Sequence, residues 1–285
     1  MHQIVDVWRH EVEVRRQDSA PSEERTRSRL ARFDWDASSR VIEADGHLEG
    51  AVFVTARPSP DGVLADIYAA GRGGAYADMV AWGVQYARAA GATVIHTMAA
   101  KGHGAGLREL GLEAVRPWWR MDRSLTGVLP SVEPSLGYEL IDAAGAAPGT
   151  WADTFNRSFA DHWRSAPRSE AEIVAGKAPE LCLMAVTSQG REPAAITLAE
   201  MDDLPDDSRP QPLGLVSSVG TVPEHRRHGL AAWLVAEELH RLQRCGARHV
   251  SLYVDALNPM RAYDVYLKLG FEVVYEAEVW EATVP

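Results

Sequence analysis

The chain has 285 residues, of which 46% are hydrophobic and 24% charged, and a formal net charge of -11 at pH 7. The apolar content suits ordinary globular cores and excludes wholesale disorder, while the length predicts roughly two domains at about 150 residues each. A net negative charge repels a phosphate backbone, which argues against a nucleic-acid partner and weakly favours a cationic or amine-bearing small molecule.

The cysteines and the hydropathy along the chain narrow the class of protein further. Cys182 and Cys245 lie far apart without a Cys-x-x-Cys spacing or clustered histidines, so neither a disulfide framework nor a metal site is predicted. The N-terminal segment mixes charged and apolar residues, and no apolar run reaches the about 18 residues of a membrane helix. We therefore expect a cytoplasmic protein without a membrane partner.

The first half of the chain alternates strand and helix signals. "HLEGAVFVTARP" (47–58) and "DGVLADIYAAG" (61–71) predict strands, followed by a helix between Gly74 and Gly91 and a strand at "TVIHTMA". A helix end that stops at Gly111 and a further strand complete this half. "TGVLPSVEPSLG" (126–137) then contains two prolines and little periodicity, which is typical of a linker.

The second half shows the same order of elements. Strands are predicted at "LCLMAVTSQG", "REPAAITLAEM" and "PLGLVSSVGTV", then a helix between Gly229 and Gly246 and a strand at "HVSLYVD". We expect a last helix over about 259–269, with Asn258 as N-cap and Pro259 at its first position, ending at Gly270 before a final strand.

The two halves are internal repeats. Residues 74–92 match 229–247, and 107–125 match 266–284, both without gaps. A strand, crossover helix and strand pair in parallel, so each half predicts an α/β unit with a mixed, largely antiparallel sheet and flanking helices. We place the first domain at 1–128 and the second at 129–285.

The segment "VPEHRRHGLAAWL" (222–234) leads from a strand through a basic turn into an amphipathic helix. A helix N-terminus presents free N–H groups, Gly229 permits close backbone approach, and Arg226 and Arg227 supply counter-charge, so the turn is a candidate pyrophosphate cradle. A glycine at such a turn without an anion role is the alternative. Neither a P-loop nor a Gly-x-Gly-x-x-Gly motif is present.

Together with Val219–Pro223 and "DALNPMRAYDVYLKLGFEVV" (255–274), the pattern Arg226-x-x-Gly229-x-Ala231 resembles the GCN5-related N-acetyltransferase (GNAT) superfamily, most strongly over 215–280. In that family the loop holds the coenzyme A pyrophosphate, and the preceding strand hydrogen-bonds the pantetheine arm. The resemblance therefore implies acetyl-CoA as co-substrate. The implied cofactor-binding residues are Val219, Gly220, Thr221, Arg226, Arg227, His228, Gly229, Leu230, Ala231, Ala232 and Asn258.

Two catalytic candidates follow from the same resemblance and from position. Tyr266 stands at the family's frequent general-acid tyrosine, although a buried packing tyrosine is the alternative. Glu200, at the end of "AAITLAEM", is the candidate general base, against the alternative of a solvated strand-end glutamate. His225 and His228 are interpreted as solvated loop residues rather than ligands.

The opening of the second half supplies the substrate candidates. "FNRSFADHWRSAP" (155–167) resembles the segment that opens the second domain in tandem GNAT proteins such as mycothiol synthase, whose substrate pockets lie near such helices and the inter-domain cleft. Phe159, Asp161, His162 and Trp163 are therefore candidates for substrate contact, and helix packing is their alternative role.

The first half lacks the features of the second at matching positions. Gly71 falls where Arg226 is, Tyr76 falls where Ala231 is, and Leu107 replaces Tyr266. We expect a degenerate copy that keeps the fold and has lost acetyl transfer.

The sequence thus predicts an acetyl-CoA-dependent N-acetyltransferase whose second domain acts on a primary amine of a small molecule by direct transfer. A non-catalytic CoA-binding sensor or scaffold, and an acyltransferase for a longer acyl group or a hydroxyl acceptor, are the alternatives. A serine hydrolase is disfavoured because Gly-x-Ser-x-Gly is absent. The acceptor and the oligomeric state do not follow from the residues.

Overall fold

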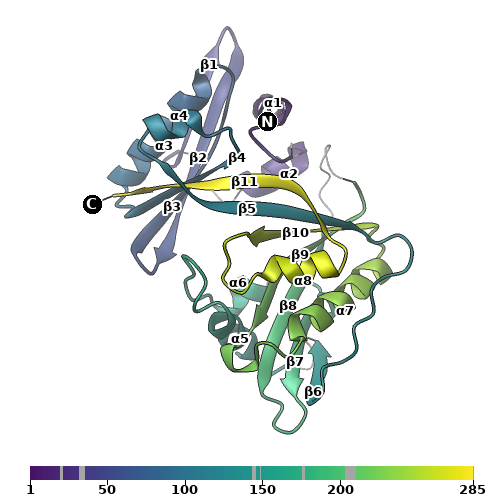
Figure 1. The fold of residues 1–285 in the computed structure, drawn as a ribbon. Helices are drawn as coiled ribbons and strands as arrows, with labels where there is room; N and C mark the ends of the chain where they lie inside the picture. Colours follow the sequence, from purple (N-terminus) through teal and green to yellow (C-terminus); the bar gives the residue numbers. More distant parts are fainter. Residues whose placement is uncertain are drawn as a thin grey trace.

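A sheet of eleven strands runs through both halves of the chain in the computed structural model, in the order β1-β2-β3-β4-β11-β5-β10-β9-β8-β7-β6 (Figure 1). The structure describes residues 1–19, 22–31, 36–142, 146–147, 149–174, 177–202 and 210–284. The first half contains α1 (His2–Glu13), α2 (Glu23–Leu30), β1 (Ser39–Ala44), β2 (His47–Ser59), β3 (Gly62–Gly71), α3 (Ala75–Ala89), β4 (Val94–Ala100), α4 (Ala105–Glu109) and β5 (Glu113–Ser124).

The second half repeats this order after an added edge strand. It contains β6 (Tyr138–Asp142), α5 (Thr150–Ser158), α6 (Glu170–Val174), β7 (Cys182–Thr187), β8 (Pro193–Asp202), β9 (Leu213–Thr221), α7 (Leu230–Arg244), β10 (His249–Asp255), α8 (Ala262–Lys268) and β11 (Glu272–Thr283), with short 3-10 turns at Pro179–Leu181 and Pro223–His225.

The repeat seen in the sequence is present in the structure. Helices α3 and α7 are both 15 residues long and begin directly after Gly74 and Gly229, while β5 and β11 are both 12 residues long. Gly91 and Gly246, which follow the two helices, have left-handed φ values of 83° and 97° that suit glycine. Helices α1 and α2 and strands β1 and β6 were not predicted.

The last helix begins later than expected. It starts at Ala262, because Arg261 has a left-handed φ of 51°, which a right-handed helix does not contain. Asn258 instead begins a turn, in which its Oδ1 accepts the Met260 N–H at 2.9 Å. The prediction of a helix from Pro259 with Asn258 as its N-cap was therefore wrong.

The two halves exchange their last strands. Strand β11, the end of the second half, pairs with β4 of the first half, and β5 of the first half pairs with β10 of the second. The two exchanged strands pair antiparallel with each other from Glu272–Asp122 to Glu281–Glu113 and so join both sheets into one. The domains expected from the sequence are therefore connected through shared strands.

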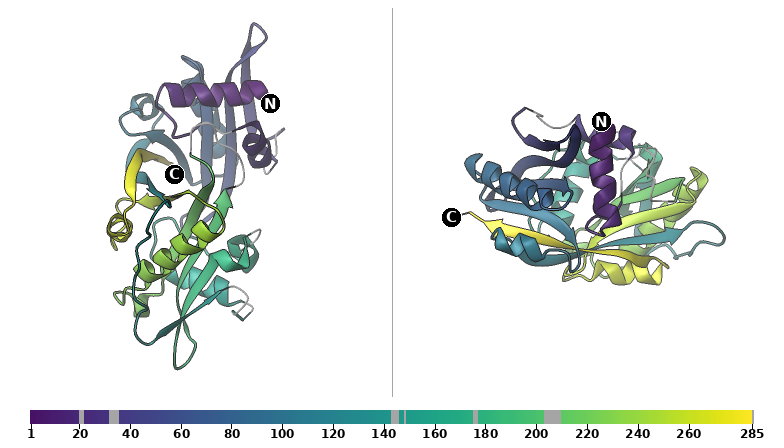
Figure 2. Two further views of the ribbon diagram at one scale, coloured as in Figure 1. Left: turned by 90° about the vertical axis from the view of Figure 1, so that its right-hand side faces the viewer. Right: turned by 90° about the horizontal axis from the view of Figure 1, so that it is seen from above.

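Helices cover both faces of each half-sheet. In the first half, α1 and α3 lie on opposite faces of the sheet (Figure 2). Helix α1 packs on Ala51 and Phe53 while α3 packs on Val52 and Val54, so that alternate β2 residues face opposite helices. In the second half, α5 and α7 cover opposite faces of β7 in the same way. Among the described residues we find no helix with the length and apolar character needed to cross a membrane.

Candidate active site

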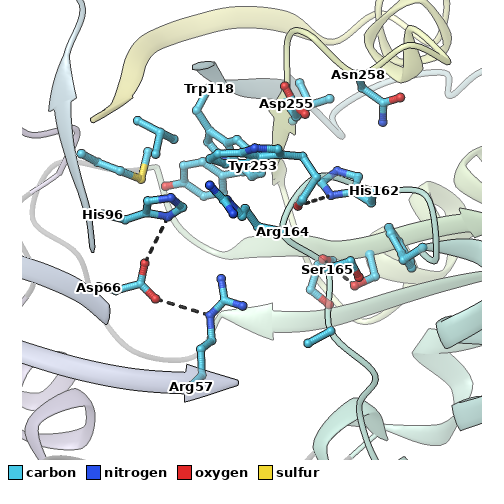
Figure 3. Close-up of a pocket in the computed structure, with 18 of the residues that line it drawn as sticks. Arg57, Asp66, His96, Trp118, His162, Arg164, Ser165, Tyr253, Asp255 and Asn258 are labelled. Carbon is cyan, nitrogen blue, oxygen red and sulfur yellow. Dashed lines mark hydrogen bonds and ion pairs between the residues drawn. The ribbon is translucent and has the colours of Figure 1, made fainter. Parts of the chain in front are cut away.

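A cavity of about 820 Å3 lies where the two halves meet, and residues of both halves line it (Figure 3). The second half contributes Ser217, Ser218 and Val219 of β9, Val254 of β10 and Tyr266 of α8. The first half contributes residues of β3 and β4, and the segment 162–168 that follows α5 completes the wall. The volume accommodates a small molecule beside a thioester arm.

The cavity begins where two parallel strands part. Strands β9 and β10 pair only from Leu213–His249 to Val216–Leu252. Beyond that point Ser217, Ser218 and Val219 face the cavity instead of β10. An open edge of this kind offers main-chain groups to an extended ligand, as an added strand would.

The loop between β9 and α7 forms an N-terminal cradle. Arg227 and Gly229 have left-handed φ values of 69° and 78°, which turn the chain into the helix. In the described part of the chain, the amide N–H groups of residues 227–232 have no hydrogen-bond acceptor, and the first helical bond runs from the Trp233 N–H to the Gly229 oxygen at 3.1 Å. Free amides at a helix N-terminus suit a bound anion.

The side chain of Arg226 is engaged in hydrogen bonds with other residues of the protein. Its Nη1 and Nη2 contact the two carboxylate oxygens of Asp161 at 2.6 and 2.9 Å, and its Nε donates to the Thr221 oxygen at 3.2 Å. The hydrogen bond from Arg226 lowers the pKa of Asp161, which stays ionised. Neither residue lines the cavity. Gly220 packs beneath the same region, since a Cβ there would lie 2.7 Å from Ser158 Cβ.

The linker and the edge strand β6 brace the loop. Ser135 donates to the His228 oxygen at 2.9 Å, and the Tyr138 hydroxyl lies 3.1 Å from His225 Nδ1. Arg227, His228 and Gly229 are exposed, Ala231 and Ala232 are half-buried, and Leu230 is buried in the core. The cradle therefore presents backbone and the Arg227 side chain to the outside.

Tyr266 reaches the cavity from α8. Its side chain is buried, and burial raises the pKa of its phenol, so the hydroxyl stays protonated at neutral pH. In the described part of the chain this hydroxyl makes no hydrogen bond, which leaves it free for a ligand. Asn258 lines the same end of the cavity.

Glu200 lies outside the cavity lining. Its Oε2 contacts the Lys177 Nζ at 2.8 Å, and its side chain is 38% exposed. The structure therefore pairs this predicted base with Lys177 and leaves it out of the cavity lining that includes Tyr266.

Three of the four substrate candidates line the cavity, namely Phe159, His162 and Trp163. Trp163 stacks on His96 of β4, with ring centroids 5.1 Å apart, and the Arg116 guanidinium lies 4.9 Å from its ring. The segment after α5 thus contacts the first half. Asp161 points elsewhere, to Arg226.

The residues with which the first half lines the cavity were not predicted from the sequence. There His96 Nε2 contacts Glu281 of β11 at 2.8 Å. Asp66 of β3 lies between His96 and Arg57, 3.5 Å from Arg57 Nε (Figure 3). Burial raises the pKa of Asp66. No local motif marks these residues, because β4 and β11 become neighbours only through the strand exchange.

The matching loop of the first half is filled by the protein. Glu11 of α1 is fully buried, and its Oε1 accepts the Gly71 N–H at 2.8 Å. Arg16 pairs with the same carboxylate at 2.7 Å and lies over the Tyr76 ring. A buried carboxylate of the chain therefore lies at the start of this loop, at Gly71, the position that matches Arg226. In the described ranges, no group of acidic, histidine or cysteine side chains is arranged to hold a metal ion.

Two repeated half-sheets define the tandem GNAT fold. In each of them two parallel strands part, and a helix that begins directly after a glycine connects these two strands. A family model described as FR47-like protein matches residues 200–281. The crystal structure of a GCN5-related N-acetyltransferase from Sphaerobacter thermophilus aligns with a TM-score of 0.74 at 20% identity, covering 92% of this chain and 85% of that one.

A tandem GNAT protein from the clavulanic acid biosynthesis pathway aligns over 100% of this chain and 95% of its own, with a TM-score of 0.71 at 18% identity. In sequence, mycothiol acetyltransferase of Kytococcus sedentarius is 33% identical over 174 residues, which are 57% of this chain. The match spans 55% of that relative's length. The chain thus has the fold of GCN5-related N-acetyltransferases and, over about half of its length, is similar in sequence to mycothiol acetyltransferases.

Proposed function

We propose that this protein transfers the acetyl group of acetyl-CoA to a primary amine of a small molecule, at one site in its second half. The observation that carries the proposal is the parting of β9 and β10 beside the free amides of residues 227–232. The open β9 edge suits a pantetheine arm, and the amide cradle suits a pyrophosphate.

The residues of the chain fit the remaining needs of acetyl transfer. Transfer to an amine needs donors for the thioester oxygen and a proton for the departing thiolate. The Val219 backbone borders the cavity and is the candidate donor, and the protonated Tyr266 hydroxyl is the candidate acid. Phe159 and Trp163 offer apolar and aromatic contact to the acceptor.

In this proposal the first half forms the wall of the cavity on the acceptor side and does not hold a second cofactor. Glu11 fills its loop, and the negative carboxylate would repel a pyrophosphate. The similarity to mycothiol acetyltransferases supports acetyl transfer as the chemistry.

The test is calorimetric titration of acetyl-CoA into the whole chain, followed by thiol release in the presence of glucosamine, tyramine and spermidine. One site per chain with amine-dependent thiol release supports the proposal. Binding without turnover favours a CoA-binding sensor, two sites contradict the role of Glu11, and absence of binding contradicts the cofactor assignment.

A further inference from the structure

We propose that His162 is the general base of this site and accepts the acceptor amine's proton at Nε2. The inference rests on the proposed function and replaces Glu200, which lies outside the cavity. His162 follows α5 and lines the cavity, and Figure 3 shows it at the same end as Asn258 and Asp255.

A hydrogen bond fixes the tautomer of neutral His162. Its Nδ1 lies 3.2 Å from the Trp163 carbonyl oxygen, which can only accept, so Nδ1 carries the hydrogen. The lone pair of the neutral ring is therefore on Nε2. Nε2 has no hydrogen-bond partner among the described residues, so that it is free to accept a proton from a ligand.

The ring lies close to the open strand edge. It packs against Phe159 with centroids 5.9 Å apart, and Phe159 Cε2 lies 2.9 Å from where a Cβ on Gly220 would be. Gly220 directly follows Val219, which borders the cavity. His162 is thus one aromatic ring away from the strand that we assign to the thioester arm.

The acidic side chains that line the cavity are already engaged near this end. Asp255 accepts from Arg116 at 2.5 Å and from the Leu257 N–H at 2.9 Å. Hydrogen bonds from Ser169 lower the pKa of Glu172, which makes it a weaker base.

The other acids and the second histidine are also engaged or distant. Asp18 contacts Arg120 at 2.8 Å and the Tyr253 hydroxyl at 3.0 Å. His96 Nε2 contacts Glu281 at 2.8 Å, and Asp66 lies 3.5 Å from Arg57 Nε. His162 remains as the basic group with a free lone pair on the Tyr266 side.

The charged groups around His162 have partners of their own. Asp161 is held by Arg226, and Arg164 is held by Glu281 and Asp61. Arg168 lies over the Phe155 ring, with its Cζ 5.4 Å from the centroid. Asp255 is engaged as described, and Tyr266 stays protonated.

Acetyl transfer at this site conserves atoms and charge. The nitrogen of the neutral amine forms a bond to the acetyl carbon, the positively charged nitrogen that results transfers one proton to His162 Nε2, and the carbon–sulfur bond breaks. The thiolate takes a proton from the Tyr266 hydroxyl, which is restored from His162 through solvent. One proton moves from nitrogen to sulfur, and no oxidant or reductant is needed.

The test compares His162→Asn with the wild type in the full chain. Asparagine Nδ2 can replace histidine Nδ1 as donor to the Trp163 oxygen but offers no base, so the loop position is kept. We expect thiol release with the most active of glucosamine, tyramine and spermidine to fall about 10²- to 10⁴-fold. The affinity for acetyl-CoA and the melting temperature should be unchanged.

Two further measurements separate a base from a structural residue. The acidic limb of the wild-type pH profile of kcat/KM should be lost in His162→Asn and retained in His103→Asn, the matched change at an exposed histidine outside the cavity lining. Imidazole added to His162→Gly should restore thiol release at least tenfold.

Turnover of His162→Asn within threefold of the wild type would overturn the inference and leave the proposed function standing. A loss of acetyl-CoA affinity or of folding that matches the loss of turnover would also overturn it. Absence of amine-dependent turnover by the wild type would overturn the proposed function, and the inference with it.

Discussion

Arg226 holds both carboxylate oxygens of Asp161, at 2.6 and 2.9 Å, and so links the turn after β9 to the end of α5. The most conspicuous basic residue of the loop is therefore a clamp between two elements. We expect the backbone amides of residues 227–232 and the exposed Arg227 to contact a bound anion.

Arg226→Ala should lower the free energy of unfolding by about 1–3 kcal/mol, because the Thr221 and Ser158 carbonyls also lose their charged donor. Asp161→Ala should cost at most about 1 kcal/mol, since Asp161 is exposed and its ion pair is screened by solvent. Urea unfolding measures both. Equal losses would show that the ion pair, rather than the carbonyl contacts, carries the stability.

Gly229→Glu should abolish acetyl-CoA binding, while Gly229→Gln should weaken it less. Both side chains meet the same left-handed φ of 78°, at a cost of about 1–2 kcal/mol, and only glutamate adds a negative charge at the cradle. Calorimetry gives the two affinities, with Gly74→Glu in the first half as control. Equal affinities for the glutamate and glutamine variants would contradict an anion site.

Tyr266→Phe should keep acetyl-CoA affinity and slow turnover by about 100-fold or more, because the proton donor for the thiolate is lost. The ring keeps its packing, 6.0 Å from Phe271, so the melting temperature should change little. Steady-state thiol release with an accepted amine measures the effect. Unchanged turnover would remove the acid role and return Tyr266 to a packing residue.

Glu281→Gln should destabilise the protein at neutral pH by about 1–3 kcal/mol and have little effect in acid. Burial alone would raise the pKa of Glu281, but hydrogen bonds from Arg164 and His96 outweigh it and hold the pKa below the ordinary 4.5. Its stabilising contribution is therefore present above pH 4.5 and is lost as the pH falls through the lowered value. Urea midpoints at neutral pH and at about pH 3 test this, and an equal difference at both would contradict it.

Fragments 1–128 and 129–285 should fail to fold separately and should assemble when expressed together. The first would lack β11 beside β4, and the second would lack β5 beside β10. Copurification through a tag on one fragment, with thermal melting of the complex, measures this. A cooperative melt by either fragment alone would show that the exchanged strand is dispensable.

The elements of the repeat could be read from the sequence because their signals are local. Gly74, Gly91, Gly229 and Gly246 mark the ends of α3 and α7, and alternating apolar residues mark the strands. The same local chemistry indicated the cradle before α7. Asn258 was misread because the left-handed Arg261 that delays α8 has no sequence signal comparable to a glycine.

By itself the sequence determined the repeat and the fold class, since these follow from turn residues and periodicity within short stretches, and its motifs carried the resemblance to the GNAT superfamily. Only the tertiary structure decided which sheet each last strand joins, that Arg226 belongs to Asp161, and that Glu11 fills the first-half loop. These pairings link residues far apart in the chain. Strands β5 and β11 have similar patterns, so their partners are set by the packing of the whole sheet, and with them the wall that joins His96 and His162 in one cavity.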